Sequence, residues 1–540
     1  MNRKRVLLSM GAMLALLMTP LSPFFQPVQA EAAPGSLYVI PGGSPANSCL
    51  TVDTPCSLDE AMAHATDGTT IYLGEGTYTH YSHQNLIDIG PGKDINLKGG
   101  WYGHRHIGLT FIELLVDPVN HPSILDGQGV RRGIYIHGGV SPIIDGIKFT
   151  RGAADVWQVA LCGGFDLTPH ACGGGIFIYQ ASATIQNSVF FDNRAMMDGS
   201  GTLMGYGGGI FVESPAGQVL IQNSVFDSNL ATQANDGNGG AIAVHGGPGY
   251  VTIYNNLFVD NVATYMGGAI SAEHYDGTML WIQANRFESN HALHAGAAIY
   301  LYYVDHAAIS QNWFEGQGGN IGFPDNGTVD INSSGFTFSR NTLIDNEPDY
   351  GLKIYIPKIF VPTVSNNLFV RSGRLATIHV LGWGGASGTD MYTVRLKHNT
   401  LVSTGANDTL AVLAKSIACT VTNCIEAIVD NTILFKYGTG FSATSGQKGK
   451  ITSDYTLFYQ VTTKLDGYVL NNHEVVQPYA GFVDYLHDDY HLVRNAPARD
   501  KGKNAGITID IDGDPRPLGG GYDVGADEFA YHTLLPLVRK

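Results

Sequence analysis

Residues 239–261 read GGAIAVHGGPGYVTIYNNLFVDN, and residues 267–290 repeat the same order as GGAISAEHYDGTMLWIQANRFESN. Each stretch opens with small residues and an isoleucine. Each closes with an asparagine, a phenylalanine two residues later and a second asparagine three residues after that. Repetition at such an interval is typical of a solenoid, in which each repeat is one unit that stacks on the next. The two stretches therefore predict one stacked body instead of several globular domains.

The repeat extends far beyond these two stretches. The phenylalanine column recurs at intervals of 26 to 36 residues, with Phe149 as an early outlier, at Phe190, Phe226, Phe258, Phe287, Phe314, Leu343, Phe369, Leu401 and Ile433. Two positions earlier, seven consecutive repeats carry asparagine, at Asn256, Asn285, Asn312, Asn341, Asn367, Asn399 and Asn431. Stacked amides of this kind hydrogen-bond from one layer to the next. The columns are too regular to arise by chance.

The composition also favours β structure. The 540 residues include 68 glycines, and only 14% are charged while 44% are hydrophobic. Helix interiors tolerate glycine poorly, whereas tight turns between strands use it. The 10% aromatic share argues against a disordered chain, and the glycines do not recur at every third position as in collagen. The formal net charge of −16 makes nucleic acid and an anionic membrane surface poor partners.

These observations predict an all-β fold, a single-stranded right-handed parallel β-helix in which each repeat is one coil. Equivalent residues then stack at the strand spacing of ~4.8 Å, with isoleucine and phenylalanine inside and asparagine at a bend. Glycine supplies the backbone conformation that sharp corners need. The capping box that begins at Ser57 predicts a short helix to about Ala65, which covers the N-terminal end. From about Asn471 the repeat fades into a small C-terminal segment.

Several short segments carry family resemblances. Residues 36–39, 69–73 and 76–78 (SLYV, TTIYL and GTY) resemble the opening of right-handed parallel β-helix proteins of the pectin-lyase-like superfamily. The Gly-Gly-Ala-Ile and Phe-x-x-Asn repeats resemble those of polymorphic outer-membrane proteins. Residues 510–516 (DIDGDPR) and 523–528 (DVGADE) resemble the choice-of-anchor Q domain of bacterial surface proteins. The resemblances imply the β-helix fold and a surface location, and they imply no particular reaction.

The first residues predict export. A basic start at residues 3–5 and a short apolar run at 6–18 precede a small-residue cleavage site at Ala30, as in a secretory signal peptide. The alternative is an N-terminal membrane anchor. Cleavage removes three basic residues, so the net charge becomes −19, and no later segment is long and apolar enough to span a bilayer. The predicted parts are a signal peptide (1–30), an N-terminal cap with the first coils (31–100), the repeat domain (101–470), the choice-of-anchor-Q-like segment (471–529) and a short tail (530–540).

The six cysteines fall into three near pairs: Cys49 with Cys56, Cys162 with Cys172, and Cys419 with Cys424. Even, local grouping in an exported chain predicts three small disulfide-closed loops. A metal site is the alternative. Zinc sites usually show closer cysteine pairs with histidines at matching offsets, and these spacings differ.

An outer face of the coils is the candidate site. If the isoleucine after each glycine run points inward, the residues one and three positions later point outward. The inner of these two columns contains Phe177, Phe211, Ala243, Ser271 and Tyr300. The outer column contains the candidate catalytic residues Glu213, His245 and Glu273 and the candidate substrate-binding residues Tyr179 and Tyr302, with His274 and Tyr303 next along the strands.

Aromatic rings and carboxylates in one line suit a glycan, because sugars stack on rings and carboxylates accept hydroxyl protons or act as general acid and base. Glu213 and Glu273 are two coils apart, or roughly 10 Å at the strand spacing, just beyond the separation of inverting glycosidases. The alternative is a solvated face whose mixed residues keep the protein soluble. Whether the protein is an enzyme therefore stays open.

The catalytic motifs of the superfamily are missing. Its hydrolase branch carries Asn-Thr-Asp, Asp-Asp, Gly-His-Gly and Arg-Ile-Lys in order. Here Asp488-Asp489 lies in the wrong region, His245 is not preceded by glycine, and Arg395-Leu396-Lys397 lies on a repeat strand. Its lyase members use calcium held by several acids plus a basic residue, and no comparable cluster is legible in the coils. The resemblance thus implies fold without activity.

Asp510, Asp512 and Asp514 alternate on one side of an extended segment and are candidate calcium ligands. Pro515 stands where an EF-hand needs glycine, so that motif is not met. The alternative is that Arg516 pairs with an acid such as Asp523 or Glu528 and closes the segment. No other cofactor is expected.

The sequence therefore predicts a secreted or surface-exposed bacterial β-helix protein that binds glycans or extracellular polymers through an outer face. A polysaccharide lyase or glycoside hydrolase acting on that face is the first alternative, and a structural surface spacer or adhesin is the second. The expected partner is a polysaccharide or cell-surface glycan. The mode of cell attachment, the ligand and the oligomeric state stay open.

Overall fold

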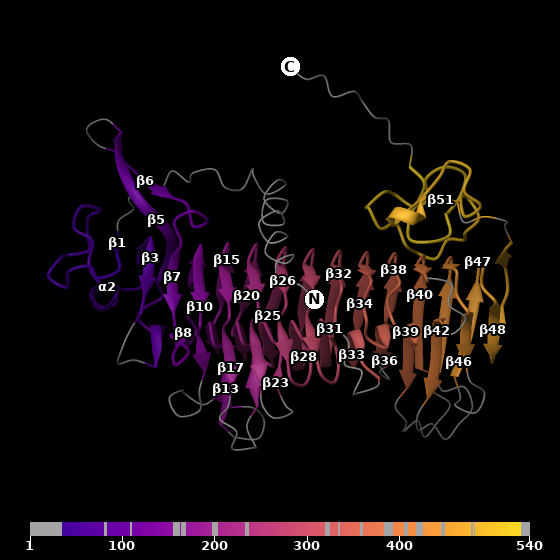
Figure 1. Cartoon of the computed structure of the whole chain (residues 1–540), viewed down its shortest axis with the longest axis horizontal. Coiled ribbons are helices and arrows are strands. Elements are labelled where there is room, and N and C mark those ends of the chain that lie inside the picture. Colours follow the sequence, from indigo (N-terminus) through magenta and orange to yellow (C-terminus); the bar gives the residue numbers. More distant parts are fainter. Residues whose placement is uncertain are drawn as a thin grey trace, which may run out of the picture.

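The computed structural model describes residues 35–530 apart from 80–83, 108–110, 155–161, 164–168, 197–203, 233–236, 319–324, 333–334, 357–359, 383–391, 404–408, 417–424, 444–448, 477–478 and 480. Over these residues the chain forms one elongated body of stacked strands, with the C-terminal segment on its side (Figure 1). Within that described part, no helix is long and apolar enough to cross a membrane.

Three rows of parallel strands run along the body. Row 1 contains the strands that follow the glycine runs: β4 (Asn85–Ile89), β8 (Arg132–His137), β14 (Ile176–Tyr179), β19 (Ile210–Glu213), β24 (Ile242–His245), β28 (Ile270–Gln283), β31 (Ile299–Ser310), β33 (Gly327–Asn332), β36 (Tyr350–Tyr355), β39 (Ala376–Gly382), β42 (Leu410–Ser416), β45 (Thr439–Ala443) and β48 (Thr463–Gly467).

Row 2 forms a second face: β1 (Ser36–Val39), β2 (Thr70–Gly74), β5 (Asn96–Ile107), β9 (Ile143–Asp145), β15 (Ala183–Gln186), β20 (Gln218–Gln222), β25 (Tyr250–Tyr254), β34 (Phe336–Ser339), β37 (Thr363–Ser365), β40 (Tyr392–Lys397), β43 (Ile425–Asp430), β46 (Gly449–Asp454) and β49 (Val469–Asn471). The long strands β28 and β31 run through both rows, which therefore form one 27-stranded sheet. That sheet also contains β6 (Phe111–Val116), antiparallel to β5.

Row 3 is a separate 14-stranded sheet: β3 (Gly76–Tyr78), β7 (Ser123–Asp126), β10 (Ile147–Thr150), β16 (Val189–Phe191), β21 (Val225–Asp227), β26 (Leu257–Val259), β29 (Arg286–Glu288), β32 (Trp313–Glu315), β35 (Thr342–Ile344), β38 (Leu368–Val370), β41 (Thr400–Val402), β44 (Ile433–Phe435), β47 (Thr456–Tyr459) and β50 (Glu474–Val475). Short strands follow it at the next corner: β11 (Ala153–Ala154), β17 (Arg194–Met196), β22 (Leu230–Thr232), β27 (Val262–Ala263) and β30 (His291–Ala292).

The inside of the coils is filled by the predicted columns. The isoleucines from Ile176 to Ile299 pair in register from coil to coil and are fully buried. The phenylalanine rings from Phe149 to Phe314 stack with centroids 4.7–4.9 Å apart and nearly parallel planes. This is the strand spacing itself, so the prediction of an aromatic interior at one ring per coil is confirmed.

The predicted column shifts by one residue near its end. Leu401 pairs with Leu434, which is fully buried, and Ile433 pairs with Thr400 on the outward side. The sequence pattern had assigned Ile433 to the interior, and that assignment is wrong. The cause is one additional residue at the preceding bend, which puts Asn431 outside the stacked asparagine column.

Two ladders of buried side-chain amides line the bends. In the first, each Nδ2 donates to the next Oδ1 at 3.0–3.1 Å through Asn256, Asn285, Asn312, Asn341, Asn367 and Asn399. The second runs through Asn193, Asn229, Asn261, Asn290 and the side chain of Gln317. Each asparagine Oδ1 also accepts the backbone N–H of the coil before it, as Asn285 does from Asn256. The ladders satisfy buried groups that the bends remove from the sheets.

The glycine runs make the corner before row 1. Gly239 has a φ of +66°, and a Cβ there would lie 2.2 Å from the carbonyl oxygen of Ile242. The equivalent Gly173, Gly207, Gly267 and Gly296 have φ values of 60–68°. Only glycine meets both demands at this corner.

The N-terminal end is covered as predicted. Helix α2 (Leu58–His64) begins at Ser57, whose side chain accepts a hydrogen bond from the backbone of Glu60. Leu58 and Met62 of this helix pack against the core. The disulfide between Cys49 and Cys56 is confirmed.

The other two predicted disulfides are described only in part. Cys172 is disulfide-bonded, while the side chain of Cys162 lies outside the described part of the chain. Cys419 and Cys424 lie outside the described residues altogether. Their pairing stays a prediction.

The C-terminal segment packs on the side of the coils (Figure 1). It contains the antiparallel pair β51 (Phe482–Asp484) and β52 (Asp489–Leu492), joined by the 3-10 turn η2 (Tyr485–His487). Its apolar residues pack on outward residues of row 3, from Ile344 to Leu457. Arg516 forms a fully buried ion pair with Glu528 at 2.8 Å, so the predicted alternative role of Arg516 is confirmed.

Candidate functional site

The predicted outer column exists. Tyr179, Glu213, His245, Glu273 and Tyr302 pair in register across five consecutive coils of row 1. Glu213 and Glu273 are two coils apart, so about 10 Å separates their backbones. The column thus places two carboxyl groups on either side of an imidazole, with a tyrosine at each end.

The inner column is covered, contrary to expectation. Phe177, Phe211 and Ala243 point outward but are fully buried, because a further layer lies on them. This overlayer is the four-stranded sheet of β12 (Cys162–Gly163), β13 (Pro169–Cys172), β18 (Gly205–Tyr206) and β23 (Gly237–Asn238). Cys172 and Tyr206 pack on the phenylalanines. The sequence did contain a signal, since Cys172, Tyr206, Asn238, Met266 and Ala295 each precede a glycine run.

Glu213 lies at the edge of the overlayer. Its side chain is only 7% exposed, and within the described residues no group donates a hydrogen bond to Oε2. Burial raises the pKa of this carboxyl to about 7. Glu213 therefore holds its proton at mildly acidic and near-neutral pH.

Glu273 is similarly perturbed but better bonded. Its Oε1 accepts hydrogen bonds from Asn238 Nδ2 at 2.8 Å and from Ser271 Oγ at 3.0 Å. Burial raises its pKa to about 7, partly opposed by the bond from Ser271. Because Asn238 belongs to β23, the overlayer directly orients this carboxyl group.

His245 lies between the two acids and is buried. Its ring meets Tyr206 and Phe211 edge-on, with centroids 4.3 and 5.0 Å apart. The two contacts fix the ring plane. His245 is therefore held rigidly between two carboxyl groups of raised pKa.

The tyrosines at the ends of the column are more accessible. Tyr179 and Tyr302 are half-buried, and Tyr303 is 50% exposed. Tyr302 and Tyr303 meet at right angles with centroids 4.3 Å apart. The side chain of the remaining candidate, His274, lies outside the described part of the chain. The accessible aromatic surface thus lies at both ends of the acidic column.

A buried charged group continues the same face, and the sequence gave no clear signal for it. Tyr300, Asp330, Lys353 and His379 pair in register on successive coils. Lys353 Nζ lies 2.9 Å from Asp325 Oδ2, and Asp330 accepts the backbone N–H of Gly296 at 2.6 Å.

The arrangement supports structure more than chemistry, because these charges are buried and matched with partners. Burial lowers the pKa of His379 to about 3, so this ring stays neutral. The group escaped sequence analysis because the glycine-isoleucine pattern lapses after Ile299, which removes the reference for inward and outward positions.

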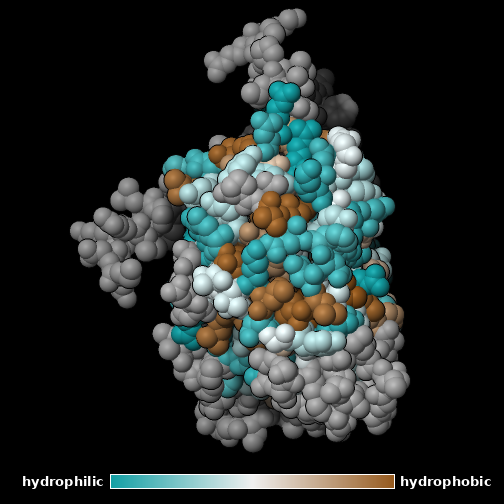
Figure 2. Space-filling view, turned by 90° about the vertical axis from the view of Figure 1, so that its right-hand side faces the viewer, coloured by the Kyte–Doolittle hydropathy of each residue, from teal (hydrophilic) through white to brown (hydrophobic). Residues whose placement is uncertain are grey.

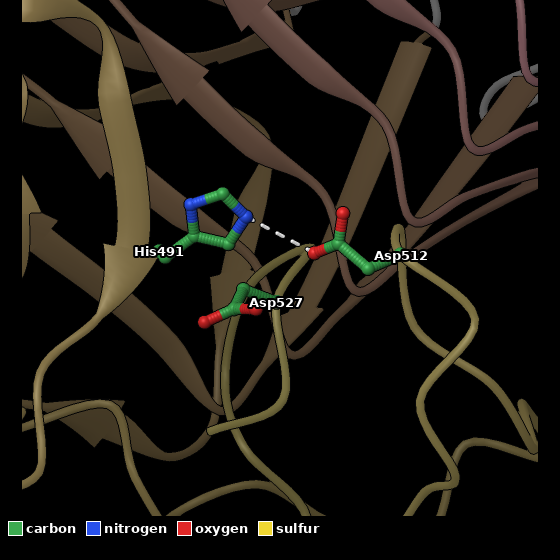
Figure 3. A group of neighbouring side chains, drawn as sticks. All are labelled: His491, Asp512 and Asp527. Atoms are coloured by element: carbon green, nitrogen blue, oxygen red, sulfur yellow. Dashed lines mark hydrogen bonds and ion pairs between the residues drawn. The ribbon is translucent and has the colours of Figure 1, made fainter. Parts of the chain in front are cut away.

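The three predicted calcium ligands do not form one cluster. Asp510 Oδ1 accepts the backbone N–H groups of Asp512, Gly513 and Asp514 at 2.8–2.9 Å, and its Oδ2 accepts that of Glu528. A carboxylate saturated by backbone donors closes a turn, so Asp510 does not fit a metal role. Asp512 instead points to His491 (Figure 3).

His491, Asp512 and Asp527 bring three ligand atoms within 4.8 Å of one another. The imidazole bonds Asp512 at 3.1 Å through Nε2 and Asp489 at 2.6 Å through Nδ1. These carboxylates raise the pKa of His491 to about 10, and burial raises the pKa of Asp527 to about 6. A metal ion must therefore displace a firmly held proton, so the cluster acts first as an ion-pair group.

A pocket of about 540 Å³ adjoins this cluster, between row 3 and the C-terminal segment. Trp313, Thr342 and Leu368, from successive coils, line one side. Tyr490 and His491 are among the residues on the other. Its walls come from distant parts of the sequence, which is why a repeat pattern alone cannot reveal it.

Comparison with known proteins supports the fold. The family model described as the right handed beta helix region matches residues 174–425. No curated protein matches the chain.

Solved structures include a pectate lyase, Pel9A, with 12% identity over 92% of this chain and 96% of that one at a TM-score of 0.33. An alginate lyase of family PL6, in complex with a trisaccharide, has 11% identity over 82% and 85% at 0.37. The catalytic unit of an α-1,3-glucanase from Streptomyces thermodiastaticus has 11% identity over 83% and 71% at 0.34. We base no argument about the site on likenesses this weak. The strand rows and the family model together make the chain an all-β, right-handed parallel β-helix.

Proposed function

We propose that this protein is an exported bacterial β-helix protein that binds a glycan along the outer column of row 1. The observation that carries the proposal is the column itself, in which two carboxyl groups with pKa values of about 7 lie between two half-buried tyrosines. Rings offer stacking surfaces to sugars, and a protonated carboxyl both donates and accepts hydrogen bonds to hydroxyl groups. The column length of five coils, about 19 Å, suits an oligosaccharide.

The test is binding to a glycan array that includes acidic and neutral bacterial and plant polysaccharides. We expect binding that Tyr179→Ala and Tyr302→Ala each weaken about tenfold, which is the loss of about 1.4 kcal/mol. Tyr254→Ala is the matched control, because Tyr254 is an exposed tyrosine on row 2. Absence of binding, or equal loss in the control variant, contradicts the proposal.

Catalysis on the same face is the second candidate function. Its specific support is the raised pKa of Glu213 and of Glu273, since a carboxyl protonated near pH 7 is a competent general acid. Turnover is measured as new reducing ends or as unsaturated products that absorb ultraviolet light. Loss of turnover in Glu273→Gln, with retention in Glu288→Gln on row 3, supports this function. Binding without turnover leaves the first proposal alone standing.

Export and surface location are part of the proposal. They rest on the signal-peptide pattern of residues 1–30, on the Cys49–Cys56 disulfide and on the choice-of-anchor-Q resemblance of residues 510–528. Fractionation of cells that express the full chain is the measurement. The mature protein is expected outside the cytoplasm with a new N-terminus near Glu31. A purely structural spacer predicts the same location with neither binding nor turnover.

A further inference from the structure

The two ends of the β-helix differ. At the N-terminal end, α2 covers the core. At the C-terminal end, every residue of β48 (Thr463–Gly467) is exposed, and within the described residues no strand pairs with its outer edge. Solenoids normally carry a polar cap at such an end, because an open edge recruits another strand.

The last layer of the core is exposed there as well. Leu465 pairs with Phe441 and continues its inward column, but Leu465 is 39% exposed whereas Phe441 is fully buried. Tyr468, Leu470 and Val476 on the same last coil are 40–72% exposed. Figure 2 views the molecule from this side and shows apolar patches interleaved with polar residues. An apolar edge of this kind is a typical interaction surface.

The backbone of β48 has a defined set of free groups. The N–H of Thr463 donates to Gly438, on the preceding coil. Because N–H and C=O groups alternate in direction along a strand, those of Lys464 and Asp466 point away from the body. A partner strand centred on Leu465 would meet both residues.

The side chains select the partner. If a second copy pairs antiparallel about Leu465, Lys464 of each copy stands directly opposite Asp466 of the other, on the outward side. The four outward backbone groups are then satisfied reciprocally, and the two exposed leucines meet at the axis. The strand is thus complementary to itself under a two-fold rotation, which is the requirement for an isologous dimer.

We propose that two copies of this chain associate end to end through β48, in antiparallel register about Leu465. The dimer doubles the length of the outer face and removes the open edge. The occupant of the edge is a second copy, because the only charges on β48 are one lysine and one aspartate, placed symmetrically about its centre.

The test is sedimentation velocity of the full chain over a wide concentration range. A dimer is expected. Lys464→Asp and Asp466→Lys each replace two attractive cross-strand pairs with two repulsive pairs and should weaken self-association about 10- to 30-fold. Mixing the two variants restores both attractive pairs, so the mixture should form heterodimers as tightly as the unmodified protein. Thermal unfolding of each variant checks that the last coil stays folded.

Three outcomes overturn the proposal. The first is a monomer at every concentration. The second is a dimer that neither variant weakens, or a mixture that fails to re-associate. The third is hydrogen-exchange protection of β48 in the monomer, since another segment, such as residues 531–540, would then cover the edge.

Discussion

Replacing Glu213 with glutamine tests whether the outer column holds a proton. The ordinary pKa of a glutamate is 4.5, and burial raises that of Glu213 to about 7 in the folded state. Below pH 4.5 both the folded and the unfolded chain hold this proton. Between pH 4.5 and 7 only the unfolded chain releases it, so the free energy of unfolding falls as the pH rises.

The magnitude follows from the two pKa values. A difference of 2.5 units corresponds to about 3 kcal/mol at 1.36 kcal/mol per unit, and above pH 7 this whole amount is lost. Glu213→Gln cannot ionise. Relative to the unmodified protein, the variant should therefore gain about 3 kcal/mol in free energy of unfolding between pH 4 and pH 8.

The assay is urea unfolding of both proteins at a series of pH values, followed through the β-sheet signal. All other ionisable groups are shared, so the difference between the two curves isolates Glu213. Infrared spectra give a second readout, because a protonated carboxyl band near pH 6 should disappear in the variant. A difference in stability that does not change with pH would refute the argument from burial.

Three further changes test the interior and the C-terminal segment. Asn285→Ala leaves the buried N–H of Asn256 without its acceptor, so it should lower the free energy of unfolding by about 2–4 kcal/mol, measured by urea denaturation against Asn472→Ala as an exposed control. Phe258→Ala opens a cavity in the ring stack and should cost about 3–5 kcal/mol; a loss below 1 kcal/mol would contradict the packing. Glu528→Gln removes the ionic partner of buried Arg516 and should destabilise the C-terminal segment by about 3 kcal/mol, seen as faster limited proteolysis there than in the coils.

The sequence predicted the body of the fold well, because every coil obeys the same local demands. Phenylalanine stacks at 4.7–4.9 Å, glycine sits at φ values that other residues avoid, and asparagine bonds its neighbours in both directions. Each demand recurs once per coil and so leaves a visible column. The prediction failed at Ile433 because a single additional residue at one bend moves every later side chain to the opposite face.

The surroundings of the candidate site were harder to predict. The register of Glu213, His245 and Glu273 followed from the glycine-isoleucine pattern, but their burial did not. Burial depends on the overlayer, whose strands have only two to four residues. Likewise, the use of Asp510 as a turn acceptor depends on backbone geometry that alternating aspartates do not encode. Local periodicity reveals repeated contacts, whereas these contacts occur once.

The amide ladders give the body an electrical direction. Backbone hydrogen bonds between coils point both ways: Ile242 donates forward to Ala269, whereas Leu257 donates backward to Ser224. Their dipoles nearly cancel, as in most sheets. Every asparagine side chain of both ladders instead donates forward, as Asn256 does to Asn285. These dipoles add along the axis, so the ladders carry partial positive charge toward the C-terminal coils and partial negative charge toward the N-terminal ones, and each added repeat lengthens that polarity.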